Sequence, residues 1–289
     1  MSIDVRPLST LEEFRHCEEL QERTRGTRAS SVWSVAQLSQ VRESGGLLLG
    51  ASESDHPGRF HGVLVDIIAE IDGYPARETV VLDVAEDQQS RGIARLLRAH
   101  ERAMLQKLGV DLCFWDTDPL RSRDLLLELD QLGAIATGHI RNALGVLRDT
   151  ANEGLATDRL RVEWWLDSPR VTAHLDRGRP LAHHEMRLHE MSVLTHSSAA
   201  ASGLRRLVRV EGPPAQRVIL IEIPEDLDRV RREDPELATD WRLQTRDLLD
   251  DLFKRGYVGV GLIHQGERSF LIFEYGTRRS VLAASSATS

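Results

Sequence analysis

The spacing of apolar residues along this chain alternates between the three-to-four-residue period of helices and the short apolar runs of buried strands. Near the N-terminus it predicts a helix that begins at Thr10 and a second helix over 34–41. Glu13 follows Thr10 at the spacing of a capping box, in which each side chain caps the other residue's backbone N–H. An amphipathic helix is predicted over 92–107. Apolar runs predict strands at 47–51, 60–71, 79–85, 112–115 and 162–166.

The pattern breaks near 167–169, and a second set of elements follows. A long amphipathic helix is predicted over 236–255, with Gly256 after its end. Residues 279–289 are small and polar and are expected to be disordered. Further apolar runs predict strands, of which the last two form a hairpin, at 207–210, 217–223, 257–263 and 269–275. This mixture predicts an α/β chain, of the α+β kind, with a mixed twisted sheet flanked by helices.

The composition is that of a soluble globular protein. Of the 289 residues, 41% are hydrophobic and 28% are charged, and the net charge is −8 at a pI of about 5.8. Nucleic-acid-binding proteins usually carry a basic face, so this balance argues against nucleic acid as the main partner. We see neither an apolar run of membrane-spanning length nor a signal-peptide pattern, so no membrane contact and a cytoplasmic location are expected. Cys17 and Cys113 make no disulfide framework, and Cys113 is expected in the core.

The most informative stretch has the sequence Gln-Ser-Arg-Gly-Ile-Ala, at residues 89–94. It follows the strand expected at 79–85 and opens the helix expected at 92–107. Glycine lets a ligand approach the backbone closely, and the N-terminus of a helix favours negative charge. The stretch therefore predicts a turn whose backbone N–H groups bind a pyrophosphate. The competing interpretation is that the glycine serves the turn alone.

A second strand and a second helix follow this turn. Asp118 suits an N-cap, Pro119 the first helical position, and Gly133 the position after a helix that runs to Leu132. Strand, phosphate-binding turn, helix, strand and helix thus follow one another. In this order the chain resembles the core of the GNAT superfamily of acyl-CoA N-acyltransferases.

Further motifs in a fixed order resemble one bacterial subgroup of that superfamily, a set of predicted acyltransferases with an extra C-terminal region. The resemblance covers roughly residues 5–275. It implies a GNAT acyl-CoA-binding domain over 1–168 and a C-terminal α+β domain over 169–278, which either extends the first sheet or forms a second GNAT-like half. The motifs that carry it lie at 45–51, at 115 with 118–120, and at 132–134, 154–160, 162–164, 222–224, 241–246 and 256–257.

The resemblance implies where acyl-CoA, as co-substrate, would lie. Val84 and Ala85 are expected beside the pantetheine arm, and the backbone of the turn is expected to hold the pyrophosphate. Arg91 or Arg95 would add positive charge near the phosphates. The implied reaction moves an acetyl or other small acyl group to the amine of a small metabolite, with no metal. The expected acyl-CoA-binding residues are Val84, Ala85, Gln89, Arg91, Gly92, Ile93, Ala94 and Arg95.

Positions that the resemblance places near the reacting groups differ from the subgroup's pattern. Glu78 and Val80 stand where that pattern has histidines, and His139 lies in a segment that carries tyrosines there. No tyrosine occurs between Tyr74 and Tyr257, so the tyrosine that protonates the leaving thiolate in many GNAT enzymes has no counterpart. The resemblance therefore supplies the acyl-CoA turn but no general acid.

Three residues are expected to replace the missing groups. Histidine titrates near neutral pH, and His139 is the candidate general acid, with a partly exposed surface histidine as the alternative. Glu78 is the candidate base; strand alternation places it and Asp83 on opposite faces, so that one of them points into the cleft. Asp116, at the end of a strand, is expected to be a free carboxylate, whereas Asp118 caps a helix.

Residues 183–189 resemble the zinc-protease motif His-Glu-x-x-His, but His189 follows His184 by five positions, which does not place both rings on one helix face. No metal site is therefore expected there. The alternative to an enzyme is a non-catalytic acyl-CoA-binding sensor or scaffold. Thioester hydrolysis and acyl transfer to oxygen also stay open. The expected partner is a small-molecule amine, which the acidic balance slightly favours, and a homodimer is left open.

Overall fold

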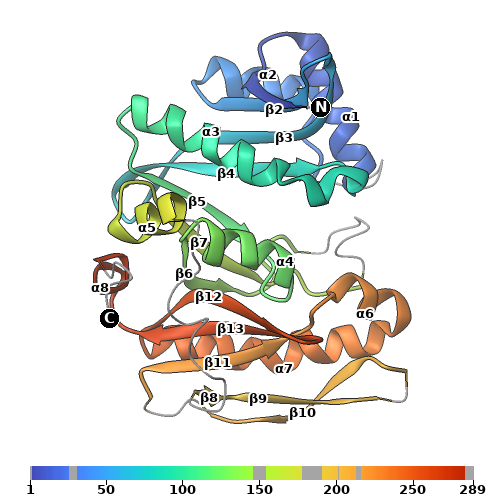
Figure 1. Cartoon of the computed structure of the whole chain (residues 1–289), viewed down its shortest axis with the longest axis vertical. Coiled ribbons are helices and arrows are strands. Elements are labelled where there is room, and N and C mark those ends of the chain that lie inside the picture. Colours follow the sequence, from blue (N-terminus) through green and yellow to red (C-terminus); the bar gives the residue numbers. More distant parts are fainter. Residues whose placement is uncertain are drawn as a thin grey trace. The chain divides into compact units, whose positions relative to one another are not determined.

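The computed structural model describes residues 2–25, 31–145, 154–177, 191–200, 202–212 and 216–283. Contacts among these residues group into two compact units, a first unit up to Trp115 and a second unit from Asp116 onward. Each unit contains strands with helices packed against them (Figure 1). The expected mixed sheet flanked by helices is therefore confirmed. The domain boundary expected at 168 stays a prediction, and the contacts change unit earlier, after Trp115.

The first unit is a sheet covered by helices on both faces. Its elements are β1 (Ile3–Pro7), α1 (Leu11–Arg25), α2 (Val35–Glu43), β2 (Leu47–Glu53), β3 (His56–Ile71), β4 (Tyr74–Val84), the 3₁₀ segment η1 (Glu86–Arg91), α3 (Ile93–Lys107) and β5 (Leu112–Thr117). The strand order is β1-β2-β3-β4-β5, and neighbours are antiparallel except β4 and β5, which are parallel. Helices α1 and α2 pack on one face, and α3 packs on the other.

Local sequence accounts for the helix starts in the first unit. The hydroxyl of Thr10 accepts from the N–H of Glu13, and the Glu13 carboxylate accepts from the N–H of Thr10 at 2.9 Å, so the expected capping box is present. Ser34 and Gln37 form a second capping box at the start of α2. These bonds satisfy backbone donors that a helix cannot satisfy internally. Both helices expected in this region are confirmed.

The second unit contains the rest of the described chain. Its elements are α4 (Ser122–Leu125), the π-helical segment η2 (Leu126–Gln131), β6 (Ile135–Ile140), β7 (Arg159–Trp165), α5 (Pro169–Arg177), β8 (Ser192–Val193), β9 (Thr195–Ala199), β10 (Arg205–Val210), β11 (Val218–Ile223), α6 (Leu227–Glu233), α7 (Pro235–Lys254), β12 (Tyr257–Gln265), β13 (Arg268–Tyr275) and α8 (Arg278–Ala283). Its main sheet has the order β7-β6-β12-β13-β11-β8, with β9 and β10 paired separately. Helix α7 packs against β6, β10 and β12 (Figure 1). None of the described helices combines the length and apolar sequence that a membrane span needs.

The C-terminal strands join a sheet that begins earlier in the chain. Gly259 of β12 pairs with Ala136 of β6, so residues beyond 169 extend the sheet of β6 and β7. A Cβ on Gly259 would lie 2.9 Å from the Ala136 side chain, which explains why a glycine stands at this crossing. Of the two arrangements left open for the C-terminal region, this pairing favours an extension.

Two expectations for the second unit are corrected. The helix after β5 begins at Ser122, because residues 118–121 form a turn in which the N–H of Arg121 bonds to the Asp118 carbonyl at 3.2 Å. The start of the tail expected to be disordered is the helix α8, in which Val281 is buried. Arg278 of this helix pairs with the buried Glu163 at 2.7 Å, a long-range partner that composition could not show. Residues 284–289 lie outside the described residues.

A buried ion pair joins α3 to the sheet of the first unit. Arg98 donates to Glu101 at 2.8 Å and to the hydroxyl of Thr79 at 2.6 Å, and Thr79 donates to Glu101 at 3.0 Å. The Arg98 guanidinium also lies 3.7 Å from the ring centroid of Trp115. Both charged side chains are fully buried. Each charge is therefore tolerated because the other lies beside it.

Glu101→Leu should lower the free energy of unfolding by about 3–5 kcal/mol, since it removes the carboxylate beside a buried guanidinium. Urea denaturation followed by circular dichroism measures the change. Lys107→Ala, at an exposed position of the same helix, should change the value by less than about 0.5 kcal/mol. Unaltered stability of Glu101→Leu would contradict this account of α3.

Candidate functional site

The parallel strands β4 and β5 pair over a short stretch and then separate. Among the described residues, Arg77 and Glu78 of β4 face Cys113 and Phe114 of β5, and the shared register ends there although β4 continues to Val84. The backbone of β4 beyond Glu78 thus has no register with β5. Unpaired backbone groups at a strand edge can bind an extended ligand.

The turn after β4 has the geometry that an anion site requires. Gly92 has a φ of +72°, in the left-handed region that favours glycine, and it immediately precedes α3. A Cβ on Gly92 would meet no atom within 4 Å, so the space beside the turn is open. The N–H of Leu96 bonds to the Gly92 carbonyl at 3.1 Å. This is the first hydrogen bond of α3, so the N–H groups of Ile93, Ala94 and Arg95 have no carbonyl partner within the helix. They lie at the N-terminal end of the helix, where the dipole favours an anion.

Buried and charged side chains hold this turn in place. The Ile93 side chain is fully buried, and a Cβ on Gly62 of β3 would lie 2.7 Å from it. Arg91 donates to Glu53 at 2.8 Å and to Gln88 at 2.6 Å. The bond from Arg91 lowers the pKa of Glu53. The guanidinium of Arg91 is thus held beside a carboxylate.

The other residues expected to bind acyl-CoA lie at the same turn. Val84 ends β4 opposite Gly62. The N–H of Ala85 donates to the His61 carbonyl at 2.8 Å, and the Ala85 carbonyl accepts from Gln88 at 2.9 Å, so Ala85 offers a ligand its side chain alone. Gln89 and Arg95 are exposed. The structure gathers all eight expected residues at one turn, and their contacts with a ligand stay a prediction.

Glu78 and Asp83 lie on the same face of β4, not on opposite faces as expected. The register with β3 shifts at Val80, which forms a β-bulge and interrupts the alternation of side chains. Thr79 bonds to α3 on one face of the sheet, whereas Asp83 accepts two bonds from Arg25 of α1 on the other, at 2.7 and 3.0 Å. Glu78 precedes Thr79 and so points to the α1 face, as Asp83 does. Both carboxylates thus lie on the α1 face, and the role of Glu78 as base stays a prediction.

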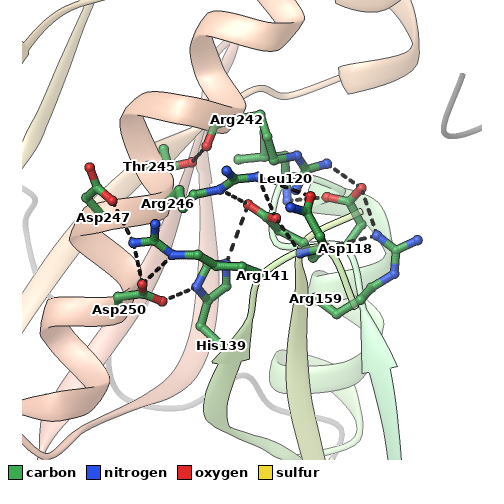
Figure 2. A network of polar contacts seen from close by, with 12 residues as sticks. Asp118, Leu120, His139, Arg141, Arg159, Arg242, Thr245, Arg246, Asp247 and Asp250 are labelled. Carbon is green, nitrogen blue, oxygen red and sulfur yellow. Dashed lines mark hydrogen bonds and ion pairs between the residues drawn. The ribbon is translucent and has the colours of Figure 1, made fainter. Parts of the chain in front are cut away.

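In the second unit, a network of charged side chains connects α7 with the ends of β5, β6 and β7 (Figure 2). Asp118, expected to cap a helix, accepts from Arg242 of α7 at 2.6 Å and from the N–H of Leu120 at 2.9 Å. Arg159 lies 3.7 Å from the same carboxylate. Burial alone would raise the pKa of Asp118, but Arg242 and Arg159 hold it below its usual range. Asp118 is therefore a buried anion rather than a helix cap.

His139 belongs to the same network and is not a surface residue. Its side chain is 1% exposed, with Nδ1 at 2.5 Å from Asp250 and Nε2 at 3.8 Å from Asp158. Asp158 also accepts two bonds from Arg246, at 2.7 and 2.8 Å. Figure 2 shows the imidazole of His139 facing Asp250 of α7. The His139 side chain is thus buried rather than partly exposed; Asp250 fixes its Nδ1 side, and Nε2 has no hydrogen-bond partner among the described residues.

Asp116 is not the free carboxylate that we expected. Arg161 of β7 donates to its two oxygens, at 2.5 and 3.1 Å. Such a bidentate pair fixes both the position and the charge of the carboxylate. Within the second unit, Asp116 is thus held by Arg161 and His139 by a hydrogen bond with Asp250, while Glu78 belongs to the first unit.

Sequence reasoning missed the charged stripe on α7. Arg242, Arg246 and Asp250 follow one another at intervals of four residues and therefore lie on one helix face. Their spacing, in a motif that already carried the family resemblance, is the signal that could have found them. Arg242 is buried, and two of its nitrogen atoms have no hydrogen-bond partner within the described residues.

Two further expectations concern cysteine and histidine. Cys113 is fully buried, as expected, and burial raises the pKa of its thiol well above the usual value. A thiol with a raised pKa is a poor nucleophile at neutral pH. The histidines at 183–189 lie outside the described residues.

Arg242→Met should lower the free energy of unfolding by about 3–5 kcal/mol at pH 7, because it leaves Asp118 charged and buried without its strongest partner. In the parent the folded-state pKa of Asp118 is below the unfolded value, so the stabilisation is present above about pH 4 and is lost as the pH falls further. The difference between variant and parent should therefore shrink in acid.

Urea unfolding between about pH 3 and pH 7 measures this dependence. The matched control is Arg255→Met, which removes an exposed pair with Asp251 on the same helix and should cost less than about 1 kcal/mol. The double variant Asp118→Asn/Arg242→Met should recover part of the loss. A difference from the parent that stays constant with pH would show that Asp118 is not the group responsible.

Comparisons with known proteins give matches among solved structures. No family model and no curated protein matches the chain. A candidate acetyltransferase of the GNAT family from Desulfovibrio desulfuricans aligns with 57% of this chain and 99% of its own, at 17% identity and a TM-score of 0.45. The ribosomal-protein-S18-alanine N-acetyltransferase from Escherichia coli aligns with 56% of this chain and 92% of its own, at 16% identity and a TM-score of 0.43.

A third structure, the IAA acetyltransferase from Bacillus cereus, aligns with 56% of this chain and 98% of its own, at 17% identity and a TM-score of 0.40. All three alignments leave more than two fifths of this chain unmatched. Over somewhat more than half of its length, the chain is thus similar to acetyltransferases, the class of enzyme that its motifs resemble.

Proposed function

We propose that this protein is an acyl-CoA-dependent N-acyltransferase of the GNAT kind, which moves an acetyl or other small acyl group to the amine of a small metabolite. The open turn at Gly92 carries the proposal, since it lies between the end of β4 and the N-terminus of α3. A turn of this kind suits a pyrophosphate, and the separation of β4 from β5 suits an extended arm. The motif order in the sequence supports the same assignment.

Different residues of the turn would contact different parts of acyl-CoA. Backbone N–H groups at 92–95 would hold the pyrophosphate, and the exposed Arg95 would add charge. Arg91 would add charge once it leaves Glu53. Val84 and the side chain of Ala85 would lie beside the pantetheine. The absence of a Cβ at Gly92 fits this role, because any side chain there would occupy the open space.

Bound acyl-CoA supplies an activated thioester carbonyl. The chain itself must position the amine and take up its proton. We assign the base to Glu78, a half-buried carboxylate on β4 at the last residue that pairs with β5. The acid is assigned to His139, whose ring the Asp250 carboxylate orients, and Asp116 is the second carboxylate.

A non-catalytic acyl-CoA sensor is the second candidate. One observation favours it: within the second unit, His139 is engaged in a hydrogen bond with Asp250 and Asp116 in an ion pair with Arg161. A sensor would need the turn at Gly92 but none of the proton transfers. The two candidates differ in one measurable property, the release of free CoA in the presence of an amine.

Gly92→Asp should weaken acyl-CoA binding from micromolar affinity by at least about 100-fold, or about 2.8 kcal/mol, because it adds bulk and negative charge where phosphate would lie. Titration calorimetry with acetyl-CoA measures the affinity and should give one equivalent per chain. Gly73→Asp is the matched control, since Gly73 also has a positive φ, of +81°, and open space around its Cβ. Equal affinity in both variants would refute the assignment of the turn.

His139→Ala should lower kcat by at least about tenfold on an amine found by screening for CoA release, while acyl-CoA affinity stays unchanged. Glu78→Gln should do the same if Glu78 takes up the amine proton. Asp247→Asn is the control for His139, because Asp247 is the exposed end of the same network. A parental rate in His139→Ala eliminates that residue as the acid. CoA binding with no CoA release for any amine would favour the sensor.

A further inference from the structure

The hairpin between β2 and β3 gathers three metal-ligating side chains at its tip. Glu53 ends β2 and pairs with His56 of β3 across a tight turn that contains Asp55. Ligand atoms of the three residues all lie within 4.8 Å of one another. The side chains of Asp55 and His56 are more than half exposed and can therefore adjust their rotamers. Exposed acidic clusters also occur without a metal, so this cluster alone assigns nothing.

A fourth side chain, that of His61, approaches the cluster from within the sheet at Glu53. His61 of β3 is 8% exposed, and its Nε2 atom lies 4.0 Å from a carboxylate oxygen of Glu53. In the part of the chain that the structure describes, this nitrogen has no hydrogen-bond partner. A buried polar group left without a partner costs about 1–3 kcal/mol. A buried imidazole nitrogen aimed at a carboxylate from this distance indicates a ligand between them.

We infer that Glu53, Asp55, His56 and His61 bind a divalent transition-metal ion of the Zn²⁺ class. Two imidazoles and two carboxylates form a set that suits four-coordinate Zn²⁺, whereas Ca²⁺ and Mg²⁺ prefer oxygen ligands alone. No metal is expected from the sequence, in which the resemblance to a metal-binding motif that we considered lies at 183–189. Hairpin pairing is what brings the four proposed ligands together.

The site has a consequence for the neighbouring turn, and this consequence rests on the proposed function. Glu53 accepts from Arg91 at 2.8 Å. A metal on Glu53 competes for that carboxylate, releases the Arg91 guanidinium toward phosphate, and adds positive charge beside the turn. Metal and acyl-CoA then raise each other's affinity by the same factor, as thermodynamic linkage requires.

The test uses the full chain, stripped of metal by a chelator and titrated with Zn²⁺ in calorimetry and with Co²⁺ in visible absorption. We expect one equivalent of either ion at this site, with Zn²⁺ displacing Co²⁺. Glu53→Gln and His61→Gln should each weaken Zn²⁺ affinity by at least about tenfold. His100→Gln, at an exposed histidine of α3, should leave it unchanged.

Two further variants separate loss of this site from misfolding and from metal capture by histidines elsewhere in the chain. Asp55→Asn changes an exposed ligand, so it should weaken Zn²⁺ binding even if His61→Gln fails to fold. Replacing His183, His184 and His189 by alanine tests whether the histidines outside the described residues capture the ion. Unchanged affinity in both Glu53→Gln and Asp55→Asn, or loss in the triple variant alone, would overturn the site.

Acyl-CoA titrations with and without Zn²⁺ separate this inference from the proposed function. The full proposal expects several-fold tighter acyl-CoA binding in the presence of Zn²⁺. Zn²⁺ binding without any acyl-CoA binding would keep the metal site and refute the function. Acyl-CoA binding by a chain that takes up no Zn²⁺ would refute the metal site and keep the proposed function.

Discussion

The second unit depends on the pairing of buried Arg242 with buried Asp118. Taking either charge out of water alone costs several kcal/mol, so the end of β5 and helix α7 are stable only when they meet. The same face of α7 carries Arg246 and Asp250, which hold Asp158 and His139. One helix from the C-terminal region therefore sets the positions of charged side chains on three strand ends. In the second unit, the C-terminal region thus supplies the partners of charged side chains that come earlier in the chain.

Local sequence patterns correctly predicted the structural features that depend on residues close together in the sequence. The capping box at Thr10, the helix that Gly92 opens and the hairpin after α7 each depend on residues close in sequence, and each was found. The ion pairs could not be found this way. Asp118 and Arg242 lie 124 positions apart, and Asp116 and Arg161 lie 45 apart, so strand position alone suggested a cap and a free carboxylate. The β-bulge at Val80 was also not predicted, because a single extra residue does not change the hydrophobic pattern noticeably. It nevertheless moves every later side chain of the strand to the opposite face of the sheet.

Asp66 of the first unit responds to acid with the opposite sign to Asp118 and Asp158 of the second unit. In the first unit, burial raises the pKa of Asp66 to about 7, so this carboxyl stabilises the fold in acid and its contribution is lost as the pH rises from about 4 to 7. In the second unit, burial raises and arginine contacts lower the pKa of Asp118 and Asp158, and the lowering prevails. Those carboxylates stabilise the fold above about pH 4 and lose that effect below it. Pairing with arginines of α7 thus makes the contributions of Asp118 and Asp158 sensitive to acid, whereas the contribution of Asp66 is sensitive to base.

The absence of the tyrosine that protonates the leaving thiolate does not by itself exclude acyl transfer. A thiol has a pKa of about 8.5, so a thiolate can leave a tetrahedral intermediate without a proton donor at modest cost. General acid assistance contributes about 10²- to 10⁴-fold, whereas holding two reactants in the correct geometry contributes effective molarities of up to about 10⁸ M. Under the proposed function, the turn at Gly92 and the carboxylate of Glu78 would supply the larger of the two effects. The contacts that hold His139 and Asp116 reduce their freedom to move protons. In an enzyme of this kind, rigid positioning can replace a dedicated acid, and that is why CoA release, rather than the presence of any one residue, decides between the enzyme and the sensor.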